Sequence, residues 1–360
     1  LMNTGGIAQK LIDFAKILVG RIPGGLAHTN ILGNTLFGSL SGSSVAASVA
    51  IGGVLIPMEE KEGYDKKFAA AVNIASAPTG LIIPPSGILI IYPVLAGCSV
   101  VGMIMSGYIP GLMWALACMV VAYVIAKKNH YPTAGKVPAS VFFKYFVDAI
   151  PSLLLIVIIV GGVMSGIFTA TESAAVAVAY TLFLSIVVYR SIKIKDLPKI
   201  LLDACETTAV IMFLIAGSNV MSFVMSFTGL PSAIGNALIS VSSNKYVILL
   251  IINLVLLVVG CFMDITPAVL IFTPIFLPVV QSFGMDPIHF GIMMVMNLGI
   301  GNITPPVGSA LFSGCSVADM DMEDMIKPIL PFYAAIFVAL MLVAYVPWFS
   351  MALPTLFGAV

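Results

Sequence analysis

Long apolar stretches without a charged side chain divide this chain of 360 residues. Residues 22–58, 68–126, 207–244 and 328–360 contain no Asp, Glu, Lys or Arg. Each stretch is long enough for at least one helix across a hydrocarbon core, which takes about 20 apolar residues. Unbroken apolar runs of this length are typical of membrane helices, so the pattern predicts an all-α protein that crosses a membrane several times.

An apolar motif with two helix-breaking residue types occurs twice. The first copy, residues 80–87, reads Gly-Leu-Ile-Ile-Pro-Pro-Ser-Gly, and the second, residues 301–308, reads Gly-Asn-Ile-Thr-Pro-Pro-Val-Gly. At the same spacing other landmarks recur, namely Pro57 with Pro278, Gly63 with Gly284 and Asp65 with Asp286. Glycine and proline within apolar sequence predict broken helices, and two such units predict a transporter built from internal repeats.

The basic residues around residues 22–58 predict a re-entrant helical hairpin. Lysines and Arg21 lie on both sides of this stretch, so both of its ends lie on the face that carries basic loops, which is cytoplasmic. Its apolar arms, 26–38 and 45–57, would each span only about 20 Å. Because such an arm is too short to cross, the Ser/Gly segment between the arms is predicted to stop near mid-membrane.

Residues 246–283 predict a second hairpin that opens to the opposite face. Its tip, residues 260–267, reads Gly-Cys-Phe-Met-Asp-Ile-Thr-Pro, and Lys245 is the only basic residue near its ends. After each hairpin, a Pro-Pro pair interrupts an apolar segment, at 68–98 and at 287–318. The two units, each a hairpin and a broken helix, are therefore predicted to be inverted copies of each other.

These boundaries predict five segments with different roles. They are an incomplete N-terminal helix (1–21), a first transport-domain repeat (22–100), scaffold helices (101–204), a second, inverted repeat (205–318) and a C-terminal scaffold helix (319–360). Residues 1–5 resemble residues 225–229, which follow an apolar helix, so we expect one or more helices to precede residue 1.

Composition supports the membrane assignment and excludes several classes of function. Hydrophobic residues make up 60% and charged residues 9%, and the mean hydropathy is +1.12, whereas soluble domains carry about 25% charged residues. The formal net charge is zero, so nothing indicates a nucleic-acid partner. The cysteines lack the spacing of a disulfide or zinc framework, and no Walker A motif occurs, so ATP is not expected to drive this chain directly.

The polar hairpin tips and the Pro-Pro segments contain the candidate chemistry. Non-helical backbone at membrane depth is tolerated only where it lines a cavity or is buried in protein, and its carbonyl and hydroxyl oxygens suit a hard cation such as Na⁺. Helix N-termini that point to the same place suit an anionic substrate. The predicted Na⁺ ligands are Ser41, Ser43, Thr79, Gly80 and Pro84 in one site, and Gly260, Asp264, Thr266, Gly301, Asn302 and Thr304 in the other. The predicted substrate-binding residues are Ser44, Ser86, Asn302 and Pro305.

Each of these candidates has a purely structural alternative. A Pro-Pro pair can simply kink a helix, and a glycine can simply let two helices pack closely. Asp264 is the strongest functional candidate because an acidic residue in apolar surroundings is costly, yet it could instead cap a nearby helix. Glu172 follows Thr169 and Thr171, a pattern that indicates a helix N-terminus more than transport chemistry.

Five short segments form an ordered set along the chain. They read Leu-Met-Asn-Thr-Gly-Gly-Ile-Ala at 1–8, Phe-Gly at 37–38 with Ser-Gly-Ser-Ser-Val-Ala at 41–46, Gly-Tyr-Asp at 63–65, Ile-Pro-Pro-Ser at 83–86 and Asn-Ile-Thr-Pro-Pro-Val-Gly at 302–308. This set resembles the large membrane subunit of bacterial tripartite ATP-independent periplasmic (TRAP) transporters over the whole chain. The segment Gly-Leu-Ala-His-Thr-Asn at 25–30 is most similar to the sialic-acid branch.

The resemblance implies a sodium-driven elevator transporter in the bacterial inner membrane, with Na⁺ as the coupling ion. Its expected substrate is an organic acid anion, with sialic acid first. Its expected partners, besides the lipid bilayer, are a small membrane (Q) subunit and a soluble periplasmic binding protein (P subunit) that delivers the substrate. Family members have a longer N-terminus, so the resemblance also implies that this chain is truncated there.

Three other functions remain open at this stage. A stand-alone sodium–dicarboxylate symporter of related architecture would need no binding protein. A channel with re-entrant filters would usually place one filter on an oligomer axis, and nothing in the sequence indicates such an axis. An intramembrane enzyme would need an acid, a base or a metal constellation, and only Asp264 qualifies, so no enzymatic activity is expected.

Overall fold

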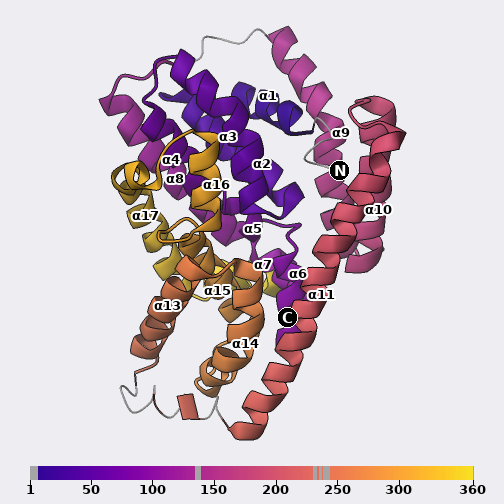
Figure 1. The fold of residues 1–360 in the computed structure, drawn as a ribbon, viewed down its shortest axis with the longest axis vertical. Helices are drawn as coiled ribbons and strands as arrows, with labels where there is room; N and C mark the ends of the chain where they lie inside the picture. The colour runs from indigo at the N-terminus through magenta and orange to yellow at the C-terminus, as the bar shows by residue number, and fades with distance from the viewer. Residues whose placement is uncertain (1–6, 134–138, 230–232, 235–236, 238–243, 360) are drawn as a thin grey trace.

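The computed structural model describes residues 7–133, 139–229, 233–234, 237 and 244–359, and in these residues it contains helices and no strand (Figure 1). Seven helical segments in this described part are long and apolar enough to cross a membrane: Val100–Lys128, Phe143–Met164, Thr171–Val188, Ile194–Met221, Lys245–Phe262, Ile265–Ser282 and Met322–Tyr345. The prediction of an all-α membrane protein is therefore confirmed. Residues 1–6, on which the expectation of a truncated N-terminus partly rests, lie outside the described residues.

The first hairpin consists of α2 (Gly25–Ser41) and α3 (Ser44–Lys61). Its arms are longer than predicted, because α2 continues through most of the Ser/Gly segment. The hydroxyl of Ser39 donates to the carbonyl of Leu36 at 2.8 Å, so this serine bonds back to its own helix. The turn is therefore confined to Gly42, whose φ is 62°, and Ser43.

The second hairpin consists of α13 (Lys245–Phe262) and α14 (Ile265–Ser282). Its turn is equally short, because only Met263 and Asp264 lie between the two helices. Gly260 and Thr266, which the sequence placed in a non-helical tip, are helical. The predicted hairpin is present, but its stretch of non-helical backbone is shorter than expected.

Both Pro-Pro motifs interrupt helices at the predicted positions. In the first unit α4 (Lys66–Ser76) and α5 (Thr79–Ile82) precede the break and α6 (Ile88–Ala96) follows it. In the second unit α15 (Pro287–Asn302) precedes the break and α16 (Ser309–Val317) follows it. Proline lacks a backbone N–H and disfavours helical backbone at the residue before it, which explains why both helices end here.

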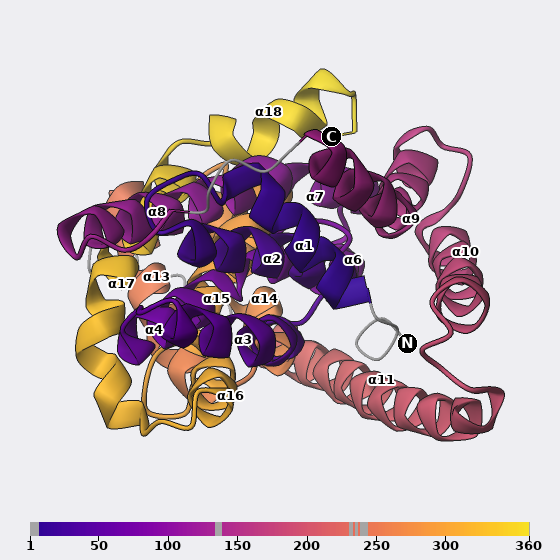
Figure 2. The ribbon, with the colours of Figure 1, turned by 90° about the horizontal axis from the view of Figure 1, so that it is seen from above.

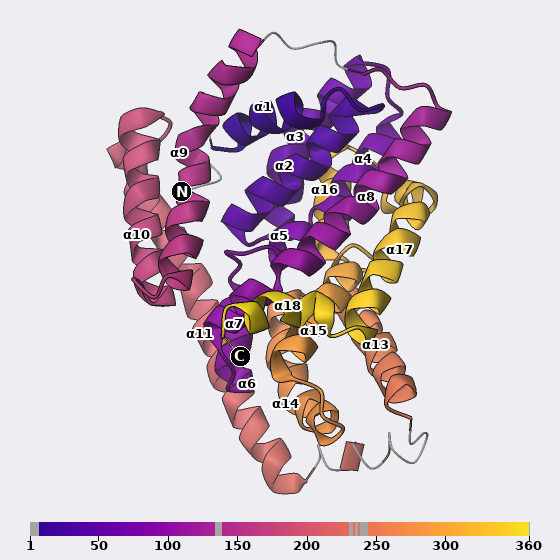
Figure 3. The ribbon, with the colours of Figure 1, turned by 180° about the vertical axis from the view of Figure 1, so that it is seen from behind.

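Helix α17 (Met322–Tyr345) shows that the two hairpins open towards opposite ends of the molecule. Near its start, Asp324 pairs with Lys67 at the base of the first unit, with 2.5 Å between Oδ1 and Nζ. At its end, the hydroxyl of Tyr345 donates to the carbonyl of Tyr246 at the base of the second hairpin, at 3.2 Å. A helix of 24 residues is about 36 Å long. The two bases are thus separated by the thickness of a membrane (Figures 1 and 3).

Two helices that the sequence assigned to the scaffold pack against the hairpin units. Helix α8 (Tyr108–Lys128) and α17 both contact α4, and α17 also contacts α15 (Figure 3). The indole Nε1 of the fully buried Trp114 donates to the carbonyl of Ala75 at 2.9 Å. These contacts place α8 and α17 directly against the transport repeats, and the division into repeats and scaffold at 101–204 and 319–360 stays a prediction. Charge patterns orient a membrane helix but do not identify its neighbours.

Helices α9 (Ala139–Met164), α10 (Ala170–Phe183) and α11 (Leu197–Thr228) lie to one side of the hairpin units (Figure 2). The segment boundary predicted between residues 204 and 205 falls inside α11. Helix α10 begins at a capping box, in which Thr169 Oγ1 accepts from the backbone N–H of Glu172 at 3.2 Å and Glu172 accepts from the N–H of Thr169 at 2.8 Å. The capping role predicted for Glu172 is confirmed.

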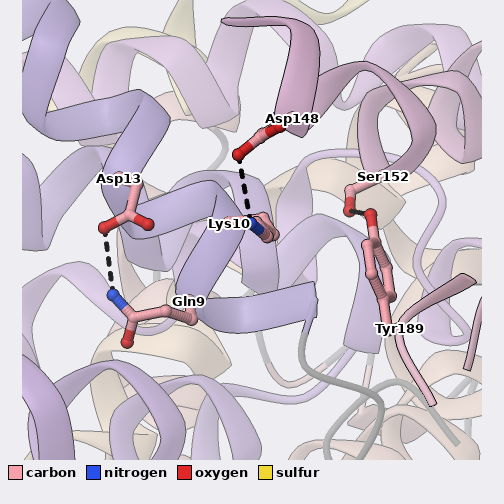
Figure 4. Close-up of polar contacts among 6 residues, drawn as sticks. All are labelled: Gln9, Lys10, Asp13, Asp148, Ser152 and Tyr189. Atoms are coloured by element: carbon pink, nitrogen blue, oxygen red, sulfur yellow. Dashed lines mark hydrogen bonds and ion pairs between the residues drawn. The ribbon is translucent and has the colours of Figure 1, made fainter. Parts of the chain in front are cut away.

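A few polar contacts attach α9 to its neighbours (Figure 4). Lys10 on α1 (Ile7–Val19) forms an ion pair with Asp148 on α9, with 3.2 Å between Nζ and Oδ2. The hydroxyls of Ser152 and Tyr189 lie 3.1 Å apart and connect α9 to the end of the next helical segment. The remaining elements are α7 (Val100–Ser106), α18 (Trp348–Leu356), a π-helical turn at Leu184–Val188 and a 3₁₀ turn at Ile194–Asp196.

Candidate functional site

The second break, residues 303–308 between α15 and α16, lies about halfway between the bases of the two hairpins. The hydroxyl of Tyr333, near the middle of α17, donates to the backbone carbonyl of Ile303 in this break. Since α17 extends from the base of the first unit to the base of the second, this contact places the break about halfway between the two ends. A site here would lie at the depth where secondary transporters bind substrate.

A chain of polar side chains connects the tips of the two hairpins at this height. The amide Nδ2 of Asn302 donates to Ser44 Oγ, at the start of α3, at 2.7 Å. The hydroxyl of Ser309 lies within hydrogen-bonding distance of Asn302 Oδ1 and, at 3.2 Å, of Asp264 Oδ1. The structure therefore brings together three predicted residues, Ser44, Asn302 and Asp264, through one that was not predicted, Ser309. We call these four residues the tip-to-tip network.

Several helix ends meet at the tip-to-tip network. Ser44 and Ser309 are the first residues of α3 and α16, Asp264 precedes the first residue of α14, and Asn302 is the last residue of α15. Three helix N-termini thus carry partial positive charge towards this place, and the C-terminal end of α15 carries partial negative charge. Such an arrangement can bind an anion and a cation close to each other.

In each unit, the first arm of the hairpin touches the broken helix through two glycines. A Cβ atom built on Gly80 would lie 2.2 Å from the Cα of Gly38, and one built on Gly301 would lie 2.5 Å from the Cα of Gly260. No side chain fits at such distances. The predicted residues Gly80, Gly260 and Gly301 therefore let two backbones touch beside each hairpin tip, and Gly38 completes the first pair.

The hydroxyl groups of the predicted first ion site already have hydrogen-bond partners within the protein. Thr79 Oγ1 is buried, 3.3 Å from Thr35 Oγ1, and donates to the carbonyl of Ser76 at 2.7 Å. The hydroxyl of Ser43 accepts from the N–H of Ala46 at 3.2 Å and so caps α3. Ser41 Oγ is 3.4 Å from the carbonyl of Ser43. The structure thus gives these hydroxyls local partners.

Ser86 and Pro84 lie in the first break, which contacts the first hairpin tip. Gly42 packs against Ser86 and the following residue. The hydroxyl of Ser86 is buried, and within the described chain it has no hydrogen-bond partner. An unpaired buried hydroxyl is costly, so Ser86 is the group of the first break that is free to bind a ligand.

Several backbone carbonyls beside the second break accept hydrogen bonds within the protein. The carbonyl of Cys261 accepts from the backbone N–H groups of Val307 and Gly308 at 3.2 and 3.4 Å. Thr304 donates its hydroxyl to the carbonyl of Ile300 at 2.7 Å. Of the predicted ligands, Gly301 accepts through its carbonyl from the backbone N–H of Thr304 at 2.9 Å, and the second ion site stays a prediction. Pro305, predicted to contact substrate, lies in the same break and is partly exposed.

Residues 1–349 match the family described as "Tripartite ATP-independent periplasmic transporter, DctM component". The chain belongs to this family. The family resemblance found in the sequence is confirmed, and so are the multi-pass membrane location and the expectation of a transporter rather than an enzyme. Membership also implies partnership with Q and P subunits.

Curated relatives cover almost the whole of this permease. It is 52% identical over 359 residues to the uncharacterized protein YgiK of Salmonella typhimurium, covering 99% of this chain and 82% of that protein. It is 39% identical over 357 residues to the C4-dicarboxylate TRAP transporter large permease protein DctM of Pseudomonas aeruginosa. It is also 39% identical over 357 residues to the sialic acid TRAP transporter large permease protein SiaM of Vibrio cholerae, and both alignments cover 99% of this chain and 84% of the relative. Identity therefore does not separate the two substrates.

Ser309 is the site residue that sequence reasoning missed. It directly follows the second Pro-Pro motif, but the matching position of the first unit is the apolar Ile88. Comparison of the two repeats therefore gave no signal at this position. Only the fold of the break, which returns α16 towards the hairpin tip, brings the hydroxyl to Asp264.

We expect Ser309→Ala to weaken uptake by this permease and to reduce its sodium affinity severalfold, because the variant removes a hydrogen bond to Asp264 worth about 1 kcal/mol. Ser313→Ala is the matched control. The hydroxyl of Ser313, one turn later on the same helix, bonds only to the carbonyl of Ser309 at 2.7 Å. Uptake against sodium concentration would be measured for both variants, and equal effects would contradict the role assigned to Ser309.

Proposed function

We propose that this permease carries out sodium-coupled uptake of an organic acid anion across the bacterial inner membrane, with a periplasmic binding protein delivering the anion. The observation that carries the proposal is the tip-to-tip network, in which Asn302 and Ser309 connect Ser44 to Asp264 at mid-height. A network between the tips of two oppositely oriented hairpins is the arrangement expected of a transport site that opens alternately to two sides.

Sodium is the coupling ion that suits the donor set. Among the described residues, no group of three or more His, Cys, Asp or Glu could hold a metal ion. A cation would therefore be bound by hydroxyl, amide and carbonyl oxygens together with Asp264. Such oxygen donors suit hard cations rather than transition metals. The candidate ligands remain those of the two predicted sites.

For the substrate, we propose an organic acid with sialic acid as the first candidate and a C4-dicarboxylate as the second. The segment at 25–30 and the SiaM relative favour sialic acid, whereas the DctM relative favours a C4-dicarboxylate. Both candidates carry carboxylate groups, which suit the N-termini of α3, α14 and α16. Ser44, Ser86, Asn302 and Pro305 are the side chains proposed to contact the substrate.

An elevator movement is proposed because the helices form two groups. Helices α9–α11 lie to one side of the hairpin units, where α9 contacts α1 and α11 contacts α14, and they present large exposed apolar side chains, among them Phe213, Phe223 and Phe227. We propose that they form the fixed scaffold and contact lipid and the small membrane subunit. The two hairpins, their broken helices, α8 and α17 would move together as the transport domain.

Reconstitution separates this proposal from a stand-alone symporter. The permease and its small membrane subunit would be placed in proteoliposomes, with a sodium gradient and radiolabelled sialic acid or a C4-dicarboxylate. We expect uptake of one of the two acids only when the cognate binding protein is added outside. Full uptake without any binding protein would favour the stand-alone symporter, and uptake of neither acid would overturn the proposed substrates.

A further inference from the structure

A row of buried, hydrogen-bonded polar side chains extends through the first unit, away from the tip-to-tip network. Asn34 on α2 donates from Nδ2 to the Oδ1 of Asn30 at 2.9 Å and to the Oδ1 of Asn73 on α4 at 3.0 Å. Asn30 in turn donates from Nδ2 to Glu59 Oε1 at 3.4 Å. The row therefore ends at a carboxyl group on α3, at the base of the first hairpin.

Glu59 is fully buried, with 0% of its surface exposed. Few polar contacts offset the free-energy cost of burying its carboxyl group. Its Oε2 has no hydrogen-bond partner within the described chain, and the contact from Asn30 is long. The two lysines at the start of α4 are engaged elsewhere, because Lys66 lies 4.0 Å from Glu60 and Lys67 pairs with Asp324. An isolated buried carboxylate is very costly, so this group is neutral unless a cation reaches it.

Other ionisable groups around Glu59 do not neutralise it. His28 lies on α2, Cys315 on α16, and Lys10, Asp13 and Lys16 on α1, which are helices that contact α3. Glu60, Lys61 and Glu62 follow Glu59 on its own helix and turn, and Tyr64 and Asp65 lie in the loop after it. None of these groups forms an ion pair or hydrogen bond with the carboxyl oxygens of Glu59 in the described structure.

The position of Glu59 gives protons a short path to water. It lies on the last turn of α3, and Glu60, Lys61, Glu62 and Gly63 directly after it are exposed. The carboxyl group is thus buried within one turn of the surface. A proton can leave it for bulk water without crossing the core of the unit.

We propose that Glu59 is a proton-binding site and that loss of its proton loosens the end of α3 from α2. The bound proton completes a neutral carboxylic acid that the buried position tolerates. When the O–H bond breaks, the proton passes to water and the carboxylate retains the electron pair. The negative charge then favours movement of the side chain towards water, away from Asn30.

Such a movement would reach the neighbouring loop. The backbone carbonyl of Glu59 accepts from the N–H of Tyr64 at 3.0 Å. The ring of Tyr64 stacks on Tyr131 with 4.5 Å between centroids, and its hydroxyl donates to the carbonyl of Pro132 at 3.1 Å. The base of the hairpin should therefore be closed at low pH and loosened as the pH rises through the midpoint of this site.

Hydrogen–deuterium exchange tests the proposal without any transport assay, so it stands apart from the proposed function. The intact permease with its small membrane subunit would be studied in lipid nanodiscs over a pH series, with intrinsic exchange rates corrected. We expect peptides that cover residues 54–66 to lose protection as the pH rises. Glu59→Gln should remove this pH-dependent step, whereas Glu60→Gln, which changes an exposed neighbour, should retain it.

Two results would overturn the proposal: protection of 54–66 in the wild type that does not change with pH, or a step that Glu60→Gln also removes. If Glu59→Gln does not fold, Asn30→Leu replaces it. Asn30 donates to the carboxyl group and so stabilises its ionised form, and its removal should shift the midpoint to higher pH. An unchanged midpoint in Asn30→Leu would overturn the assignment to Glu59.

Discussion

Asp264→Asn is expected to raise the sodium concentration for half-maximal uptake by about tenfold or more. Asparagine keeps the size of the side chain and one oxygen but removes its negative charge. A factor of ten in affinity corresponds to about 1.4 kcal/mol, and interactions with a charged group are worth about 1.5–3 kcal/mol. Uptake against sodium concentration would be measured in proteoliposomes that contain equal amounts of folded wild-type and variant protein.

Ser43→Ala is the control for this prediction. Ser43 occupies the equivalent position in the first hairpin, but its hydroxyl already caps α3 through the N–H of Ala46. Its removal should cost about 1 kcal/mol of stability and change the sodium curve less than Asp264→Asn does. An Asp264→Asn protein with the wild-type sodium curve would remove Asp264 from the ion site.

Gly301→Ala is expected to abolish uptake and to lower the yield of folded protein strongly. A Cβ at this position would lie 2.5 Å from both the Cα and the carbonyl carbon of Gly260. Backbone atoms cannot move aside as a flexible side chain can, so the cost should exceed about 3 kcal/mol, the upper range of ordinary overpacking. Gly80→Ala should act in the same way, because its Cβ would lie 2.2 Å from the Cα of Gly38.

Gly53→Ala is the matched control for the glycine variants. It also places a methyl group on a glycine within a hairpin helix, but the nearest atom, on Val317, would be 3.8 Å away. Size-exclusion profiles after solubilisation and uptake in proteoliposomes would be compared for the three variants. Near-normal folding and uptake by Gly301→Ala would show that the close backbone contact is dispensable.

The sequence predicted the features that depend on local chemistry. Both helix breaks were predicted because proline removes a backbone N–H wherever it occurs. The two hairpins were predicted because charged residues mark their ends and polar residues mark their tips. The capping role of Glu172 was predicted for the same reason, since capping involves residues only a few positions apart.

The features that depend on tertiary packing could not be predicted. Nothing in the sequence indicated that Ser309 reaches Asp264, because its counterpart in the first repeat is Ile88. The neighbours of α8 and α17 could likewise not be predicted, because an apolar helix can be buried by lipid or by protein with the same composition. The short turn of the first hairpin was missed because serine and glycine, which are common in turns, stay helical in α2 as far as Ser41.

We propose that sodium drives uptake through the two hairpin units, and the sodium dependence of the initial uptake rate is the decisive measurement. The permease, its small subunit and its binding protein would be assayed in proteoliposomes at a clamped membrane potential. We predict no uptake without sodium and a steeper than first-order dependence, since the two proposed ion sites would bind at least two ions per cycle. With a singly charged anion, uptake should also increase at inside-negative potential, by about 2.3 kcal/mol of driving force per net charge per 100 mV. Sodium-independent uptake by the wild type would contradict the account.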